Sequence, residues 1–195
     1  MTKLTVQRES LGTNTQHASV SYVNGSDEQV LVSADYALPT STVFGAHLLE
    51  GFLFSIGYTH SFASPLADGA SIDIVIAFAQ GIQPRVAIEG LSVGNAMGYL
   101  YEGATTTGGT ALTDVNLNRN SLISSNAAAV LNPTVTATGT LLGSYVLIGG
   151  VKKKASGGDI STASLVLKPL TNYLLRLTNV SGAAQAAEMT ITWYE

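Results

Sequence analysis

The chain has 195 residues, a formal net charge of -4 and only 11% charged side chains, whereas 46% of its residues are hydrophobic. This length is enough for one sizeable β domain or two small ones, and so few charges on so apolar a chain indicate that partner proteins cover part of the surface. The acidic balance argues against nucleic-acid binding, which needs a basic face. The absence of cysteine excludes disulfides, a thiolate nucleophile and a cysteine-type zinc site.

The sequence offers no segment of the kind that enters or crosses a membrane. The first residues, MTKLTVQRES, lack an apolar core of signal-peptide length. The apolar runs are short and broken by glycine or serine, far below the roughly 20 residues of a membrane-spanning helix. We therefore expect a soluble protein made in a cytoplasm, with no membrane partner.

Strand patterns dominate the N-terminal half. Two β-type runs flank Asn24-Gly25, a dipeptide typical of tight hairpins. Residues 43–62, dense in aromatic and β-branched side chains, predict one or two buried strands. In residues 71–81, isoleucines at positions 72, 74 and 76 share one face with Asp73 opposite, and Val75 indicates a strand partly buried on both sides.

The C-terminal half continues in the same style. An Asn-rich stretch, 116–126, reads as an exposed connection. A weak internal echo, TTTGGTAL at 105–112 and VTATGTLL at 135–142, predicts two matching turns between strands. The last two strands each carry one apolar stripe: Tyr173, Leu175 and Leu177 in the first, and Met189, Ile191 and Trp193 in the second.

Strands at this spacing, with Gly, Pro and Asn between them, predict an all-β sandwich or barrel. AHLLEGFL (46–53) and SSNAAAVL (124–131) are each candidates for one short helix. The polar residues 1–17 are expected to form an N-terminal arm, and residues 18–195 a single domain. A split near residue 98 into two β subdomains is the alternative.

The sequence contains no recognisable motif of catalytic or metal-binding residues. His17, His47 and His60 lie far apart without metal-ligand spacing. The carboxylates are scattered over strand ends and turns, where such residues are usually caps or solvated. No phosphate-binding glycine loop or nucleophile elbow is present. We expect a non-enzymatic protein without catalytic, cofactor-binding or metal-binding residues.

The C-terminal half resembles a family of small virion proteins of tailed bacteriophages, associated with the head. The match covers about residues 99–195. The segments that carry it are YLYEGATTTGGTAL (99–112), NLNRNS (116–121), NPTVTATGTLL (132–142), LKPLTNYLLRLTNVSG (167–182) and the final TWYE.

This resemblance implies a jelly-roll-like β-sandwich that acts as a capsid decoration or cement protein on the virion surface. It would be a homotrimer, made in the bacterial host cytoplasm, that binds the major capsid protein at capsomer junctions and stabilises the head. The alternative is a tail or head-fibre component that binds a host receptor or glycan. Glycan binding predicts exposed aromatic side chains grouped on one face, with Tyr99, Tyr101 and Tyr194 as candidates.

Two loops are the predicted partner contacts, with ordinary solvated turns as the alternative interpretation. One is the basic, glycine-flanked cluster Lys152, Lys153 and Lys154. The other is the NLNRNS connection, with the polar residues Asn116, Asn118, Arg119, Asn120 and Ser121.

Overall fold

The computed structural model describes residues 5–8, 18–23, 29–31, 43–149, 156–159 and 165–195. Contacts divide the chain into two compact units, residues 1–42 and residues 43–195. The first unit holds the antiparallel strands β1 (Thr5–Arg8), β2 (Ala18–Val23) and β3 (Gln29–Leu31), in the order β1-β2-β3. β2 and β3 pair on either side of the predicted Asn24-Gly25 turn, which itself lies outside the described residues.

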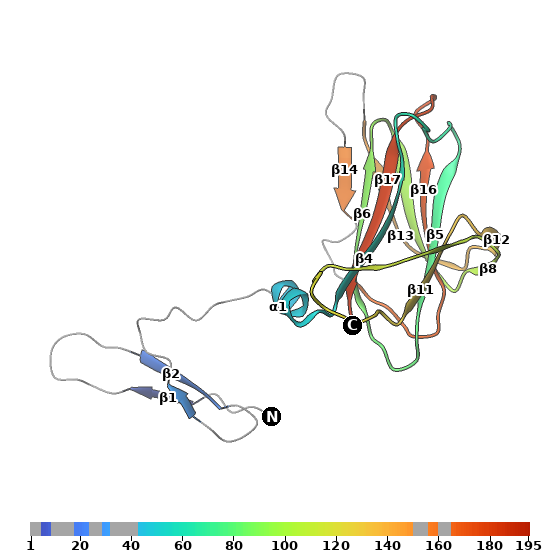
Figure 1. Ribbon diagram of the computed structural model, residues 1–195. Helices are drawn as coiled ribbons and strands as arrows, with labels where there is room; N and C mark the ends of the chain where they lie inside the picture. The colour runs from blue at the N-terminus through green and yellow to red at the C-terminus, as the bar shows by residue number, and fades with distance from the viewer. Residues whose placement is uncertain (1–4, 9–17, 24–28, 32–42, 150–155, 160–164) are drawn as a thin grey trace. The chain divides into compact units, whose positions relative to one another are not determined.

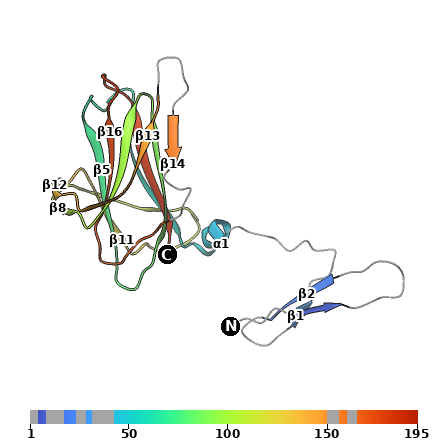
Figure 2. The ribbon, with the colours of Figure 1, turned by 180° about the vertical axis from the view of Figure 1, so that it is seen from behind.

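The second unit is a sandwich of two antiparallel sheets, seen from opposite sides in Figures 1 and 2. Sheet I has the order β10 (Val115–Asn116), β4 (Leu53–His60), β17 (Ala187–Tyr194), β6 (Arg85–Ser92) and β14 (Ser156–Asp159), and β15 (Leu165–Val166) also pairs with β6. Sheet II has the order β13 (Thr140–Leu147), β7 (Ala96–Glu102), β16 (Tyr173–Asn179), β5 (Ser71–Phe78), β11 (Ala127–Leu131) and β9 (Thr110–Leu112).

The strand order is that of a jelly roll. When β4, β5, β6, β7, β13, β14, β16 and β17 are counted as first to eighth, sheet I reads 1-8-3-6 and sheet II reads 2-7-4-5. Two Greek keys folded over each other give this arrangement. The predicted all-β, jelly-roll-like sandwich is therefore confirmed, and one helix, α1 (Val43–Glu50), precedes it in the described chain.

The core is formed largely by the apolar faces that the alternating sequence pattern predicted for β5, β16 and β17. Every predicted apolar member of β16 and β17 is at most 1% exposed, as are the three isoleucines of β5. Trp193 lies between the rings of Phe54 and Phe78, with centroids 6.0 and 5.8 Å away. Burying each such side chain contributes about 2 to 3 kcal/mol, so the last strand is a main part of the framework.

The internal echo corresponds to a real pairing. Its first copy forms β8 (Thr105–Thr107) and β9, and its second copy forms β12 (Thr134–Ala137) and β13, each with glycine at positive φ in the turn. β8 and β12 pair with each other as a two-stranded ribbon at the side of the sandwich (Figure 1). Val135 of this ribbon packs against Val75 and Leu174, which explains why β5 is buried on both faces, as predicted.

Two secondary-structure predictions need correction. The strand prediction for residues 43–62 holds only from Leu53, because residues 43–50 form α1; the candidate helix at 46–53 thus exists but begins earlier. The candidate helix at 124–131 is wrong, since residues 127–131 form β11 between β5 and β9. Alanine favours helix locally, but pairing with two strands outweighs that preference.

The predicted domain limits, an arm at 1–17 and a domain from residue 18 with or without a split near 98, stay predictions. The sandwich itself occupies the second unit, and residue 98 lies inside β7, paired with Leu177 of β16.

Candidate interaction surface

The C-terminal end of α1 is closed by a glycine turn. Gly51 has φ +82°, its N–H donates to the carbonyl of Leu48, and the N–H of Phe52 donates to the carbonyl of His47. This pair of bonds is the Schellman motif, which needs a residue in the left-handed region where glycine has no steric penalty. A Cβ at Gly51 would also collide with Ser121, so the turn and the NLNRNS connection are packed against each other.

The polar side chains of NLNRNS hold that connection to the helix end. Asn116 Nδ2 donates to the carbonyls of Gly51 (2.8 Å) and Ile123 (3.0 Å), and Asn118 Nδ2 donates to the carbonyl of Leu49 (3.0 Å). The Asn116 and Asn118 side-chain oxygens accept backbone N–H groups two residues further on. These asparagines therefore satisfy backbone groups that a helix end leaves without intrahelical partners.

The predicted contact residues thus divide into three groups. Asn116, Asn118 and Ser121 are half-buried and hydrogen-bonded within the connection, so their side chains serve the framework. Arg119 and Asn120 are exposed, and the Arg119 guanidinium donates to the carbonyl of Asn116 at 3.4 Å. Lys152, Lys153 and Lys154 lie outside the described residues.

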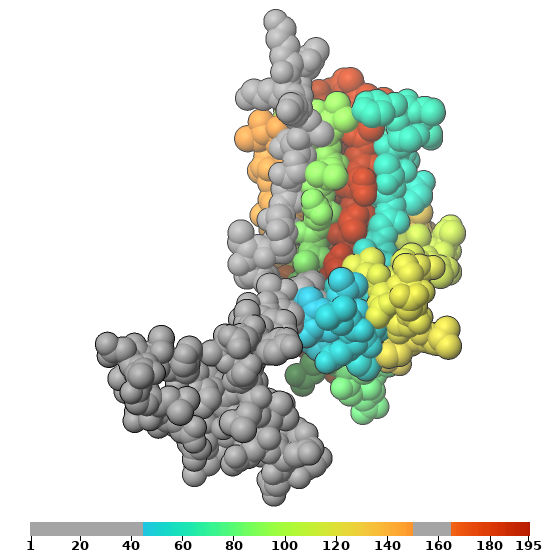
Figure 3. Space-filling model, turned by 60° about the vertical axis from the view of Figure 1, so that its left-hand side comes forward, coloured from blue at the N-terminus to red at the C-terminus, as the bar shows by residue number. Residues whose placement is uncertain are grey.

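Several apolar side chains of the connection and of the end of α1 reach solvent. Leu122 is 99% exposed and Leu49 77% exposed. Together with their neighbours they form a surface that we call the α1-end patch: Leu48, Leu49, Phe52, Leu117, Leu122 and Ile123. Figure 3 shows α1 in blue beside the yellow connection at one end of sheet I. Exposed apolar patches on soluble domains mark interaction sites. The signal for it in the sequence was Leu117, Leu122 and Ile123, which lie within the asparagine-rich stretch interpreted as polar.

The α1-end patch rests on the end of β17. The His47 ring stacks on the Tyr194 ring with centroids 4.1 Å apart, and the Tyr194 hydroxyl accepts a hydrogen bond from Arg85. Glu195 Oε1 accepts the N–H of Asn126 at 2.8 Å. The residues of TWYE therefore connect the core to the helix and to the connection beneath the patch.

The three tyrosines considered for glycan binding do not form one group. Tyr99 and Tyr101 stack on the outer face of sheet II, with ring centroids 6.0 Å apart, whereas Tyr194 lies on sheet I against α1. Arg176 is the strand partner of Tyr99, and its guanidinium makes two 2.7 Å bonds to the Asp73 carboxylate. The hydrogen bonds to this carboxylate raise the pKa of Arg176, so its guanidinium remains charged.

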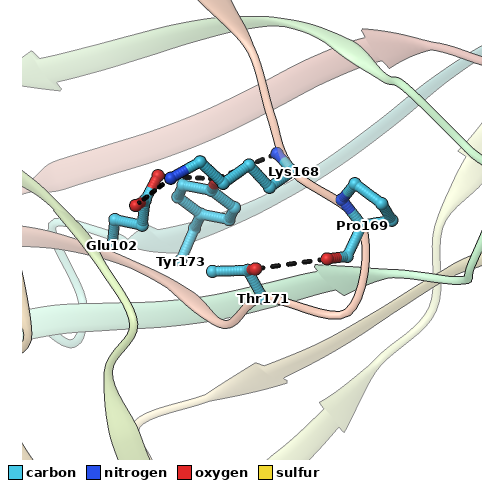
Figure 4. Close-up of polar contacts among 5 residues, drawn as sticks. All are labelled: Glu102, Lys168, Pro169, Thr171 and Tyr173. Carbon is cyan, nitrogen blue, oxygen red and sulfur yellow. Dashed lines mark hydrogen bonds and ion pairs between the residues drawn. The ribbon is translucent and has the colours of Figure 1, made fainter.

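The LKPLTNY segment forms a second polar cluster, shown in Figure 4. Lys168 Nζ lies 2.7 Å from Glu102 Oε1, and the Tyr173 hydroxyl donates to Glu102 Oε2 at 2.9 Å while accepting the backbone N–H of Lys168. Hydrogen bonds from Lys168 and Tyr173 lower the pKa of Glu102, and burial raises the pKa of Tyr173. The ionised Glu102 carboxylate and the protonated Tyr173 hydroxyl bond to each other, and both bond to Lys168. These bonds tie the end of β7 to the start of β16.

The described residues contain no group of three or more His, Asp or Glu side chains able to hold a metal ion. Of the three histidines, His47 lies in α1, His60 is the last residue of β4, and His17 is outside the described residues. Among helices in the described ranges, none has the length and apolar character to cross a membrane.

The jelly-roll order, the α1-end patch and the Glu102 cluster are thus the features from which function can be inferred. The phage-family resemblance of residues 99–195 stays a prediction. Comparison of the chain with models of known protein families, with curated proteins and with solved structures found no match.

Proposed function

We propose that the protein is a non-enzymatic component of a bacteriophage virion, a decoration or cement protein that binds the outer capsid surface at capsomer junctions. The observation that carries this proposal is the α1-end patch, in which polar side chains are used internally and leucines project outward. Such a surface is suited to docking on another protein.

The physical chemistry of the patch supports this role. Burying apolar surface stabilises a contact by about 25 cal/mol per Å², and few charges have to be desolvated at the same time. The connection under the patch is held by asparagine bonds and by Glu195, which limits the entropy lost on docking. Many identical copies on one shell then give high total strength from modest single contacts.

The proposal includes self-association as a homotrimer. Light scattering after size exclusion should give about three times the 20.2 kDa chain mass. A stable monomer would remove the trimer from the proposal.

The experiment is a binding assay with purified capsids stripped of the protein. The wild-type chain should bind in stoichiometric numbers and raise the temperature at which the capsids disrupt. A variant with Leu49→Gln and Leu122→Gln should lose at least tenfold in affinity while its own thermal unfolding is unchanged, since both side chains are exposed.

Ile148→Gln is the matched control, because Ile148 is also well exposed, at 65%, but lies just past β13 of sheet II. It should bind capsids like the wild type. If the wild type binds host cells and fails to bind capsids, the receptor-binding alternative replaces the cement function. If the leucine variant binds as the wild type does, the patch is not the docking surface.

A further inference from the structure

A hollow of about 270 Å³ lies at the end of sheet I opposite α1. It is lined by the ends of β4 and β6, the start of β17 and the residues that adjoin them. Its volume is just below the roughly 300 to 1,000 Å³ of pockets for drug-sized ligands. It therefore has room for a single side chain or a small molecule rather than for a large cofactor.

The walls of this hollow are mainly apolar. Phe62 is 81% exposed, Val93 is 37% exposed, and Leu91 is half-buried at the strand position opposite Glu188. Ala186 and Ala187 complete the apolar lining. An exposed phenyl ring beside aliphatic side chains accommodates a methylene stem, and its face also attracts a cation.

Glu188 is the one carboxylate in the described lining. Thr190 donates to Glu188 Oε1 at 3.2 Å, and no described basic side chain lies within ion-pair distance of it. A carboxylate accepts about four hydrogen bonds, so acceptor capacity remains. Ser92 lines the same hollow, and its hydroxyl is buried without a hydrogen-bond partner among the described residues. The other titratable lining group, His60, has its Nδ1 3.1 Å from the carbonyl of Ser64.

We infer that this hollow, which we call the Glu188 pocket, binds the basic side chain of a partner protein, a lysine or arginine. The aliphatic stem packs against Phe62, Leu91 and Val93, and the cationic head meets the Glu188 carboxylate. Shape and charge together select this occupant, because a purely apolar side chain would leave the carboxylate desolvated and unpaired. The inference stands apart from the proposed function, since it can be tested with a small amine and no capsid.

The test is a titration of the full chain with hexylammonium, followed by backbone amide NMR shifts. At neutral pH this probe is charged like a lysine, whose ordinary pKa is about 10.4. We expect saturable shifts at residues 59–62, 91–93 and 186–188 in the millimolar range, and at least fivefold weaker binding of the neutral probe 1-hexanol. Glu188→Gln should reduce hexylammonium binding to the hexanol level, and Phe62→Ala should weaken both probes.

Glu89→Gln is the matched control. Glu89 is an exposed carboxylate on the same outer face, paired with Thr190, but it is not part of the pocket lining. This variant should bind hexylammonium like the wild type. Equal affinity for hexanol and hexylammonium, unchanged binding by Glu188→Gln, or no saturation below about 50 mM would each overturn the inference. The comparison of hexylammonium with hexanol uses only the wild-type chain. It therefore tests the inference even if Glu188→Gln fails to fold.

Discussion

The two ends of sheet I differ in which groups they present to solvent: one end exposes apolar side chains, and the other places a carboxylate in a hollow. At the α1 end, asparagine side chains turn inward to backbone carbonyls, and leucines project into solvent. At the other end the surface is hollow, and a carboxylate lies among apolar walls. An exposed apolar surface can bury area on a broad partner, whereas a hollow with one carboxylate selects a single side chain. Because β4 has eight residues at about 3.3 Å each, the two surfaces lie about 25 Å apart.

At both ends an asparagine side chain bonds to several backbone groups, but the two asparagines differ in burial. At the pocket end of the sandwich, Asn179, the last residue of β16 in sheet II, is 0% exposed and bonds to the carbonyls of Leu66 and Ala183, the N–H of Ser181 and the amide of Gln185. Asn118 makes similar bonds at the α1 end but remains half-buried. The pocket end should therefore be the more rigid of the two, because unmade bonds there cannot be replaced by water.

The largest expected effect comes from deleting TWYE (192–195), which should prevent folding. The deletion removes Trp193 from the core, Tyr194 from under α1 and the Glu195 bond to Asn126. Loss of a buried tryptophan alone costs about 3 to 5 kcal/mol, a large part of a typical domain's stability. Circular dichroism and amide NMR would detect the loss. A soluble product with unchanged thermal stability would show that the α1 end does not depend on the last strand.

Substituting one asparagine at each end should lower the free energy of unfolding by different amounts. Asn179→Ala should lower the free energy of unfolding by about 2 to 4 kcal/mol, because it leaves several buried partners without bonds. Asn118→Ala should cost about 1 kcal/mol, since water can reach the groups it leaves. Urea unfolding of both variants measures the difference. Equal losses would contradict the difference in rigidity proposed here.

The last prediction concerns Tyr145, between the two ends of the sandwich, and its effect appears only at high pH. Tyr145 lies against Gly90 and Gly98, where any Cβ would meet its ring, and burial raises its pKa from 10.0 to about 12. The unfolded chain releases this proton first, so the stability from neutral Tyr145 is complete below pH 10 and is lost as the pH rises toward 12. A shift of about two pKa units corresponds to a loss of at most about 3 kcal/mol. Unfolding of Tyr145→Phe should be less sensitive over this range, and an identical pH slope would exclude Tyr145 as the cause.

The sequence predicted those parts of the fold that depend on local alternation. The stripes of β5, β16 and β17 follow from period-two patterns that hold whatever the neighbouring strands are. The identity of β11 could not be read in this way, because its alanines become a strand only through two partners distant in sequence. The Glu188 pocket could not be predicted from the sequence either, because residues near 60, 91 and 187 come together only through the strand order β4-β17-β6.

The predicted contact connection, residues 116–121, stays a prediction, but the structure shows that some of its polar side chains are already used within the fold. Asparagines and an arginine in a row suggested a polar contact loop, yet the carbonyls at the end of α1 use the amides of Asn116 and Asn118. Only the position of α1 makes those carbonyls available, and the sequence favoured strands for residues 43–62, with a short helix at 46–53 as a candidate. The roles of the asparagine side chains thus depend on an element more than sixty residues away in the chain.

The place of β17 between β4 and β6 has a consequence for biosynthesis. Its hydrogen-bonded partners include Ser55, 136 residues earlier in the chain than Ile191. As the chain leaves the ribosome, β4 and β6 lack the strand that lies between them until residues 187–194 have been made. Contacts of such long sequence separation fold slowly and leave apolar strand edges open to other chains. Rapid production at high temperature should therefore favour aggregation of nascent chains, and slower synthesis should increase the soluble yield.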